Sequence, residues 1–218
     1  MRSTLLNQSH IKLLEEYGLV NLNTYNLRLY HFQPGEMILQ EGAPMDACYL
    51  IVKGDAKVYI TSENGKALLM NCLISKGFIG EMELLTKSFH SYCRYVAETT
   101  FVCIRIPYSV ISLAMQTSNV FLNKLTMELS SKLYTSMQCF LHRVHYTAEE
   151  RLSAHILQHS SNGNFSAVLN DVSLSLGISY RHLFRLLEQF CVLGILEKTQ
   201  QGYKILDYKE LEDRTSKQ

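Results

Sequence analysis

A glycine between two helical patterns, Gly177, is the feature that most constrains how this chain can fold. Apolar residues flank it and then recur at steps of three and four, at Val172, Leu176, Ile178, Leu183, Leu186, Leu187 and Phe190. Gly177 can adopt the left-handed conformation that ends a helix, and Ser179 can cap the next one. The stretch predicts a helix-turn-helix, although an ordinary helical hairpin has the same pattern.

The second of these helices carries the candidate DNA contacts. Tyr180, Arg181 and Arg185 fall away from its apolar face. Each arginine can bind guanine O6 and N7 through two hydrogen bonds, whereas Tyr180 suits a phosphate or a thymine methyl. We expect Ser179 and Lys198 to contact phosphates and so to position the helix.

Charge bears on this prediction because the chain has no overall basic field. Its 218 residues carry a formal net charge of +1, and residues 145–218 contain 8 Lys/Arg against 9 Asp/Glu. Residues 172–206, however, contain four Lys/Arg against two Glu. Any affinity for DNA must therefore come from a local patch.

Upstream, the apolar period changes from that of a helix to that of strands. Residues 1–27 predict an amphipathic packing helix, and from Leu29 short alternating runs are separated by turn signals such as Asn64-Gly65. Strands are expected over Ala67–Ile74 and Tyr92–Ile106. This pattern predicts a β-barrel or double-sheet jelly roll over residues 28–107, within an α+β chain.

Helical periodicity returns after Pro107. A short helix is expected near Tyr108–Met115 and a long one near Val120–His142. The long helix carries what reads as one apolar stripe, at Leu122, Leu125, Leu129, Leu133, Met137 and Phe140. We expect this stripe both to pack on its own barrel and to pair with a second chain as a coiled coil, which predicts a homodimer.

A capping box at Thr147–Glu150 begins a further helix. After the helix-turn-helix, Leu193–Leu196 and Tyr203–Leu206 flank Gln200-Gln201-Gly202, which predicts the hairpin of a winged helix, and the tail from Lys209 is expected to fray. The predicted domains are an N-terminal helix and barrel (1–116), a dimerisation helix (117–144) and a winged helix-turn-helix (145–218).

Four ordered motifs resemble the Crp/Fnr superfamily of bacterial transcription regulators. They are the opening hairpin 32–38 with Glu41-Gly42, the strand and turn 49–54, the cassette 78–85 that resembles a cyclic-nucleotide phosphate-binding cassette, and the recognition helix 179–185. Within this superfamily, the runs Gly-Glu-Met-Glu-Leu-Leu (80–85) and Ser-Tyr-Arg-His-Leu (179–183) resemble those of the YeiL-like branch. The resemblance covers nearly the whole chain and implies a non-enzymatic regulator without catalytic residues.

The resemblance also implies an effector pocket in the barrel. By family position it would be formed by Gly80, Glu81, Met82, Ser91, Tyr92, Lys132 and Ser136. Cyclic-nucleotide members pair the phosphate with an arginine, but Ser91 stands there, and Arg94 is at an odd offset. We therefore do not expect cyclic AMP to be the effector. Glu81 would instead be a structural turn residue or pair with Lys132.

Cysteine and histidine patterns predict no cofactor or metal. The chain has no cysteine before Cys48, which argues against an Fnr-type iron–sulfur cluster. Cys139 on the long helix suits a packed thiol better than an interchain disulfide. His155 and His159, spaced i,i+4, suit a solvated helix face better than a metal site, and His31 and His90 do not form the His-x-His cluster of a catalytic cupin barrel.

The expected function is sequence-specific binding of a homodimer to a palindromic operator, with half-sites about one helical turn apart. By resemblance, a signal of unknown chemistry would pass from the barrel through the long helix to the DNA-binding domain, and RNA polymerase would be a further partner. No signal peptide or membrane-spanning run is apparent, so a cytoplasmic location is expected. The alternative is a ligand-sensing barrel whose DNA domain is degenerate and serves protein interaction.

Overall fold

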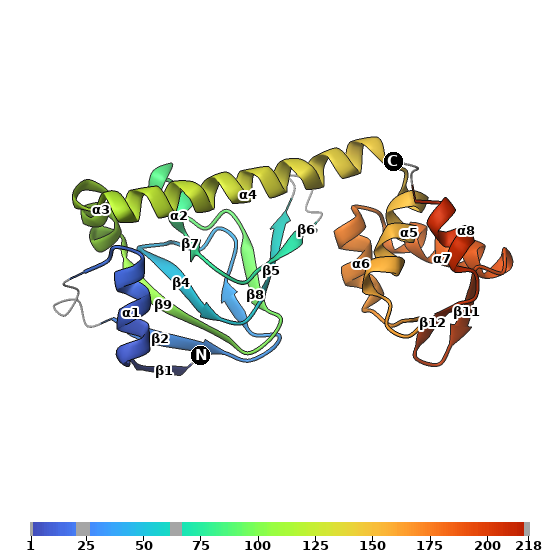
Figure 1. Ribbon diagram of the computed structural model, residues 1–218, viewed down its shortest axis with the longest axis horizontal. Coiled ribbons are helices and arrows are strands. Elements are labelled where there is room, and N and C mark those ends of the chain that lie inside the picture. The colour runs from blue at the N-terminus through green and yellow to red at the C-terminus, as the bar shows by residue number, and fades with distance from the viewer. Residues whose placement is uncertain (1, 21–26, 62–66, 216–218) are drawn as a thin grey trace. The chain divides into compact units, whose positions relative to one another are not determined.

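The structure is a computed structural model that describes residues 2–20, 27–61 and 67–215 (Figure 1). The chain divides into two compact units. The first extends to Thr135, except for Ala67–Asn71, which group with Ser136 and the residues after it in the second unit. Among the described residues, no helix is both long and apolar enough to cross a membrane.

Two antiparallel sheets form the frame of the first unit. One has the order β1-β2-β9-β4-β7 and the other the order β3-β8-β5-β6. The strands are β1 Arg2–Leu5, β2 Arg28–Phe32, β3 Met37–Leu39, β4 Ala47–Lys53, β5 Ala56–Thr61, β6 Ala67–Ile74, β7 Phe78–Ile79, β8 Arg94–Ala97 and β9 Phe101–Pro107. The two sheets confirm the predicted jelly-roll fold.

The central strands of the five-stranded sheet, β4 and β9, are buried on both faces. On β9, Phe101 and Cys103 pack with residues of the second sheet, including Ile38 and Ala97. Ile104 and Ile106, two residues apart on the same strand, instead belong to a cluster shared with the helices. Because successive strand residues face opposite ways, one strand can serve both cores, which explains why its sequence is nearly all apolar.

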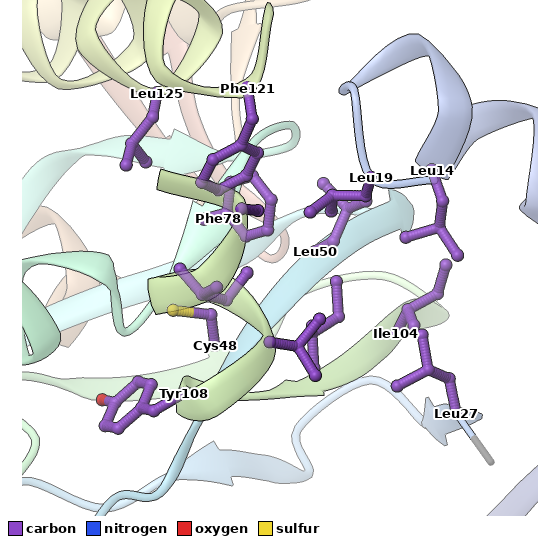
Figure 2. Packing of buried hydrophobic residues seen from close by; sticks show 14 of the residues in the cluster. Leu14, Leu19, Leu27, Cys48, Leu50, Phe78, Ile104, Tyr108, Phe121 and Leu125 are labelled. Carbon is purple, nitrogen blue, oxygen red and sulfur yellow. The ribbon is translucent and has the colours of Figure 1, made fainter. Parts of the chain in front are cut away.

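Helices cover the other face of that sheet. They are α1 Gln8–Glu16, α2 Glu81–Leu85, α3 Tyr108–Thr117 and α4 Asn119–His145. Leu14 of α1 and Phe121 and Leu125 of α4 enter the shared cluster, as Figure 2 shows. The ring of Phe78 meets those of Tyr17 and Phe121 edge-on, with centroids 5.3 and 5.8 Å apart, which fixes the start of α4 on the sheet.

One expectation for this unit needs correction. Residues 1–27 are not all helical, because Arg2–Leu5 pairs with Arg28–His31 as an edge strand. The strands expected over Tyr92–Ile106 are β8 and β9, and the long helix expected near Val120–His142 is α4. The Asn64-Gly65 hairpin lies outside the described residues.

The predicted single stripe on α4 is wrong, because α4 has two apolar faces. Leu125 is buried against the sheet and Leu129 is partly buried there, whereas Leu133 and Met137 are 64% and 53% exposed. The exposed face follows a heptad pattern, at Val120, Asn123, Met127, Ser130, Tyr134, Met137, Leu141 and Val144. We call this set the α4 seam; apart from Asn123 and Ser130 its side chains are apolar, and all are exposed.

The second unit contains the predicted winged helix-turn-helix. Its elements are α5 Ala148–His159, β10 Asn164–Phe165, α6 Leu169–Leu176, α7 Tyr180–Val192, β11 Leu196–Thr199, β12 Gly202–Ile205 and α8 Tyr208–Asp213. The capping box is confirmed, since Thr147 Oγ1 accepts from Glu150 N and Glu150 Oε2 accepts from Thr147 N. The three-stranded sheet has the order β10-β12-β11.

The expectation that the tail frays from Lys209 is wrong. Residues 208–213 form α8, whose Leu211 is fully buried in the core of the unit. Arg214 then bonds to Glu149 at the start of α5 and to Glu210, which ties the C-terminal helix to the first helix of the unit. Charge alone made this segment resemble a loose tail, but its one leucine anchors it.

Candidate functional site

The helix-turn-helix geometry is determined locally. Gly177 ends α6 with φ +67°, in the left-handed region that favours glycine. Ser179 follows in extended conformation, and its Oγ accepts a hydrogen bond of 3.2 Å from His182 N. The Ser179 hydroxyl hydrogen is not used by this cap, so Ser179 can both begin the helix and donate to a phosphate.

The recognition helix α7 separates its apolar and polar faces sharply. Leu183, Leu186, Leu187 and Phe190 are at most 5% exposed. On the opposite side Tyr180, Arg181 and Arg185 are exposed, and they line an open groove together with Ser179, His182, Phe184 and Glu188. The core thus fixes the rotation of the helix about its axis, which directs the two arginines outward.

Both arginines keep their hydrogen-bonding capacity. Within the described ranges, neither Arg181 nor Arg185 forms an ion pair or an internal hydrogen bond. They are spaced i,i+4, so their guanidinium groups project from one side of the helix. This arrangement suits two-pronged contacts with base edges in a major groove.

The wing places the remaining predicted contact, Lys198, beside the recognition helix. Lys198 lies on β11, and its Nζ is 5.5 Å from the ring centroid of Phe184. Sequence reasoning missed Phe184. The available signal was an aromatic residue that falls outside the apolar series of α7, directly before Arg185.

In the barrel, Gly80, Glu81 and Lys132 lie together. Gly80 starts α2 with φ +97°, and its carbonyl accepts from Tyr108 Oη at 3.0 Å. Glu81 is 4% exposed, and its carboxylate bonds to the Lys132 ammonium of α4. Lys132 Nζ also donates to Phe78 O at 2.5 Å. Burial raises the pKa of Glu81, and the Lys132 ammonium partly offsets that shift.

The other expected pocket residues have different surroundings. Met82 and Tyr92 are 50% and 40% exposed, and the Tyr92 hydroxyl bonds to Thr86. Ser91 is buried, and its hydroxyl donates to Cys93 O at 2.8 Å. Ser136 is partly buried and belongs to the second unit. Of these polar side chains, Ser91 and Tyr92 thus have hydrogen-bond partners within the first unit.

A second buried carboxylate makes the cassette electronegative. Glu83 is 2% exposed and accepts from Tyr92 N at 2.9 Å. Burial, and then the negative charge of Glu83, raise the pKa of the Cys93 thiol to about 11. Ser91, which stands where cyclic-nucleotide members have the cassette arginine, supplies no positive charge to pair with a phosphate.

The expected solvated face on α5 holds for His159, which is exposed, but not for His155, which is partly buried. The rings of His155 and His159 stack with centroids 4.0 Å apart, and His155 meets Phe165 edge-on. Burial, and then His159, lower the pKa of His155 to about 4. Across the described parts of the chain, no three His, Cys, Asp or Glu side chains converge to hold a metal ion.

Comparison with known proteins agrees with this geometry. The cyclic nucleotide-binding domain family matches residues 29–118. Regulatory protein YeiL of Escherichia coli O157:H7 is 30% identical over 184 residues, covering 84% of each chain. Electron transport regulator A of Shewanella oneidensis is 26% identical over 189 residues, covering 82% of this chain and 75% of that one.

Among solved structures, a Crp/Fnr-family transcriptional regulator from Eubacterium rectale has the same fold. Its TM-score is 0.76 at 18% identity, with coverage of 96% of this chain and 95% of that one. Barrel, long helix and recognition helix together define a DNA-binding transcription regulator. The chain belongs to the Crp/Fnr family, whose members regulate transcription and are not enzymes.

Proposed function

We propose that this chain binds DNA sequence-specifically as a homodimer and recognises a palindromic operator. The observation that carries the proposal is the amphipathic recognition helix, which buries four apolar residues and leaves Arg181 and Arg185 exposed without ion pairs among the described residues. Two such helices related by a two-fold axis would enter the major groove at half-sites about one helical turn apart. Ser179, Tyr180 and Lys198 would contact the backbone or neighbouring bases.

The α4 seam supports the dimer. Its apolar members are largely uncovered: Val120 is 55%, Met127 72%, Tyr134 64%, Met137 53%, Leu141 41% and Val144 60% exposed. The steps of three and four are those of the a and d positions of a two-stranded coiled coil. A second copy of α4 would bury this seam on the side of the helix opposite Phe121, Leu125 and Lys132.

The same heptad register bears on Cys139. This residue falls two positions after Met137 and two before Leu141, at the outward-facing f position of the register. The thiol would therefore point away from the partner helix. We propose that Cys139 is an ordinary thiol in the dimer and forms no interchain disulfide.

We further propose that the barrel responds to a signal other than cyclic AMP. The support is chemical: Ser91 replaces the phosphate-pairing arginine, and Glu81 already bonds to Lys132. Tyr17, the residue directly after α1, donates from Oη to Glu128 Oε1 at 2.5 Å and so contacts α4 one turn before Lys132. Glu128 and Lys132 are thus polar α4 residues through which a change in the barrel would reach the long helix, beside the apolar contacts of Phe121 and Leu125. RNA polymerase is a further expected partner, by family membership.

Selection of bound sequences from random duplexes tests the DNA-binding proposal. The wild type should enrich a palindrome, and Arg185→Ala should lose the preference at the bases that Arg185 contacts, by about 1–3 kcal/mol. Arg185→Lys keeps the charge but loses the planar fork, so it should bind DNA with reduced preference. Arg28→Ala, an exposed arginine of the barrel, is the matched control.

Two outcomes would contradict the proposal. If Arg185→Ala kept the wild-type preference, the recognition helix would not read sequence through this residue. If the wild type bound no duplex even at low salt, where phosphate contacts are strongest, the domain would instead serve protein interaction.

A further inference from the structure

Lys198 lies on the face of the wing sheet that packs against the recognition helix. In the β11–β12 ladder Lys198 is opposite Tyr203, and Leu196 is opposite Ile205. Leu196, Tyr203 and Ile205 are each at most 5% exposed and belong to the core of the unit. Because side chains alternate across a strand, Lys198 shares their face, whereas Lys204 lies on the other. Lys198 is therefore a cation at the rim of an apolar face.

Phe184 lies where that face meets the recognition helix. The Lys198 ammonium is 5.5 Å from the centroid of the Phe184 ring, within the range of a cation–π contact. Phe184 is half-buried and immediately precedes Arg185. The ring thus limits the positions that a long, flexible lysine side chain can adopt, next to the arginine expected to bind a base.

The ammonium is held in place but its charge is not neutralised. Lys198 is exposed, and it forms no ion pair within the described part of the chain, although Glu188 lies one helical turn after Phe184. A cation–π contact leaves the N–H donors of the ammonium available, unlike a bond to a carboxylate. The Lys198 ammonium can therefore donate to a phosphate without first losing a partner.

We propose that Phe184 is a positioning residue that holds the Lys198 ammonium against a DNA phosphate beside the bases contacted by the recognition helix. This inference rests on the proposed DNA binding and adds to it a residue and its role. Phe184 restricts the lysine before DNA arrives, so less conformational entropy is lost on binding. The wing and the recognition helix thereby bind DNA as one rigid surface.

The experiment measures operator affinity by fluorescence anisotropy over a series of KCl concentrations. Lys198→Gln should reduce the slope of log affinity against log salt by about 0.9 per half-site, or about 1.8 per dimer. Phe184→Leu keeps the charge but removes the ring, and should weaken binding about two- to fivefold per half-site. In the Lys198→Gln background, Phe184→Leu should cause no further loss of affinity. In the protein that keeps Lys198, Phe184→Trp retains an aromatic ring and should bind DNA as tightly as the wild type.

Lys204→Gln is the matched control, because it removes a lysine from the other face of the same wing. It should change the salt slope less than Lys198→Gln. Thermal unfolding by circular dichroism should be the same for all these variants and the wild type, since each altered side chain is at least partly exposed. If Phe184→Leu unfolds at a lower temperature than the wild type, Phe184→Met takes its place in the double-mutant comparison with Lys198→Gln.

Three results would overturn the inference. An unchanged salt slope in Lys198→Gln would show that Lys198 meets no phosphate, and an equal loss in Lys204→Gln would show a diffuse effect of wing charge. Equal losses from Phe184→Leu in both backgrounds would show that Phe184 acts independently of Lys198. In each of these three cases the wild type still binds DNA, so only the role of Phe184 and Lys198 is overturned. A wild type that binds no duplex overturns the proposed function and this inference together.

Discussion

Replacing Lys132 by methionine leaves the buried Glu81 carboxylate without its cation. The Glu81 side chain is 5% exposed and that of Lys132 is 31% exposed. Methionine also leaves Phe78 O without the donor at 2.5 Å. Removing one partner of a buried ion pair costs about 3–5 kcal/mol. Because Lys132 is about a third exposed and therefore screened by solvent, we expect the lower end, about 3 kcal/mol.

Thermal unfolding followed by circular dichroism measures this loss. For a chain of this size, about 3 kcal/mol lowers the midpoint by about 6–12 °C. Lys76→Met, which changes an exposed lysine, is the control and should leave the midpoint unchanged. The double variant Glu81→Gln/Lys132→Met should recover at least half of the loss, because it removes the buried charge itself.

The pH dependence gives the reasoning its sharpest test. Burial already raises the pKa of Glu81 above its ordinary value of 4.5, and removing the Lys132 ammonium raises it further. The folded variant therefore binds a proton more readily than the unfolded chain does. Its deficit relative to the wild type should be largest at neutral pH and shrink as pH falls towards 4.5. A deficit that is absent at neutral pH, or that does not change with pH, would refute the argument.

Three further predictions concern other parts of the molecule. Met137→Glu places two carboxylates in the same d layer of the coiled coil, so it should weaken dimerisation at least about tenfold, as measured by sedimentation equilibrium. Leu122→Glu, which lies off the α4 seam, should leave dimerisation unchanged. Equal effects of the two variants would refute the assigned seam. Cyclic AMP should leave operator affinity unchanged, and a tightening at millimolar nucleotide would refute the assigned cassette chemistry. Because the pKa of His155 is lowered to about 4, the unfolded chain binds a proton below pH 6.5 that the folded chain does not. When the pH falls from 7 to 5, the free energy of unfolding measured in urea should therefore decrease by about 1–2 kcal/mol more for the wild type than for His155→Gln. Equal decreases would contradict a buried neutral ring.

The sequence by itself determined the features that depend on near neighbours. Gly177 and Ser179 set the turn because a left-handed glycine and a capping hydroxyl act over a few residues, and Thr147 and Glu150 began α5 in the same way. Period-two alternation predicted the jelly roll, since it reports which faces of a strand are buried. The order of the motifs was enough to indicate the family.

Only the tertiary structure decided which surface each side chain meets. The apolar residues of α4 looked like one stripe, but the sheet covers Leu125 and leaves Met137 exposed, because the position of that sheet relative to the helix depends on strands far away in sequence. Tyr17 bonds to Glu128, and Lys198 lies over Phe184, for the same reason. Such contacts join residues through the fold rather than along the chain, so no local pattern contains them.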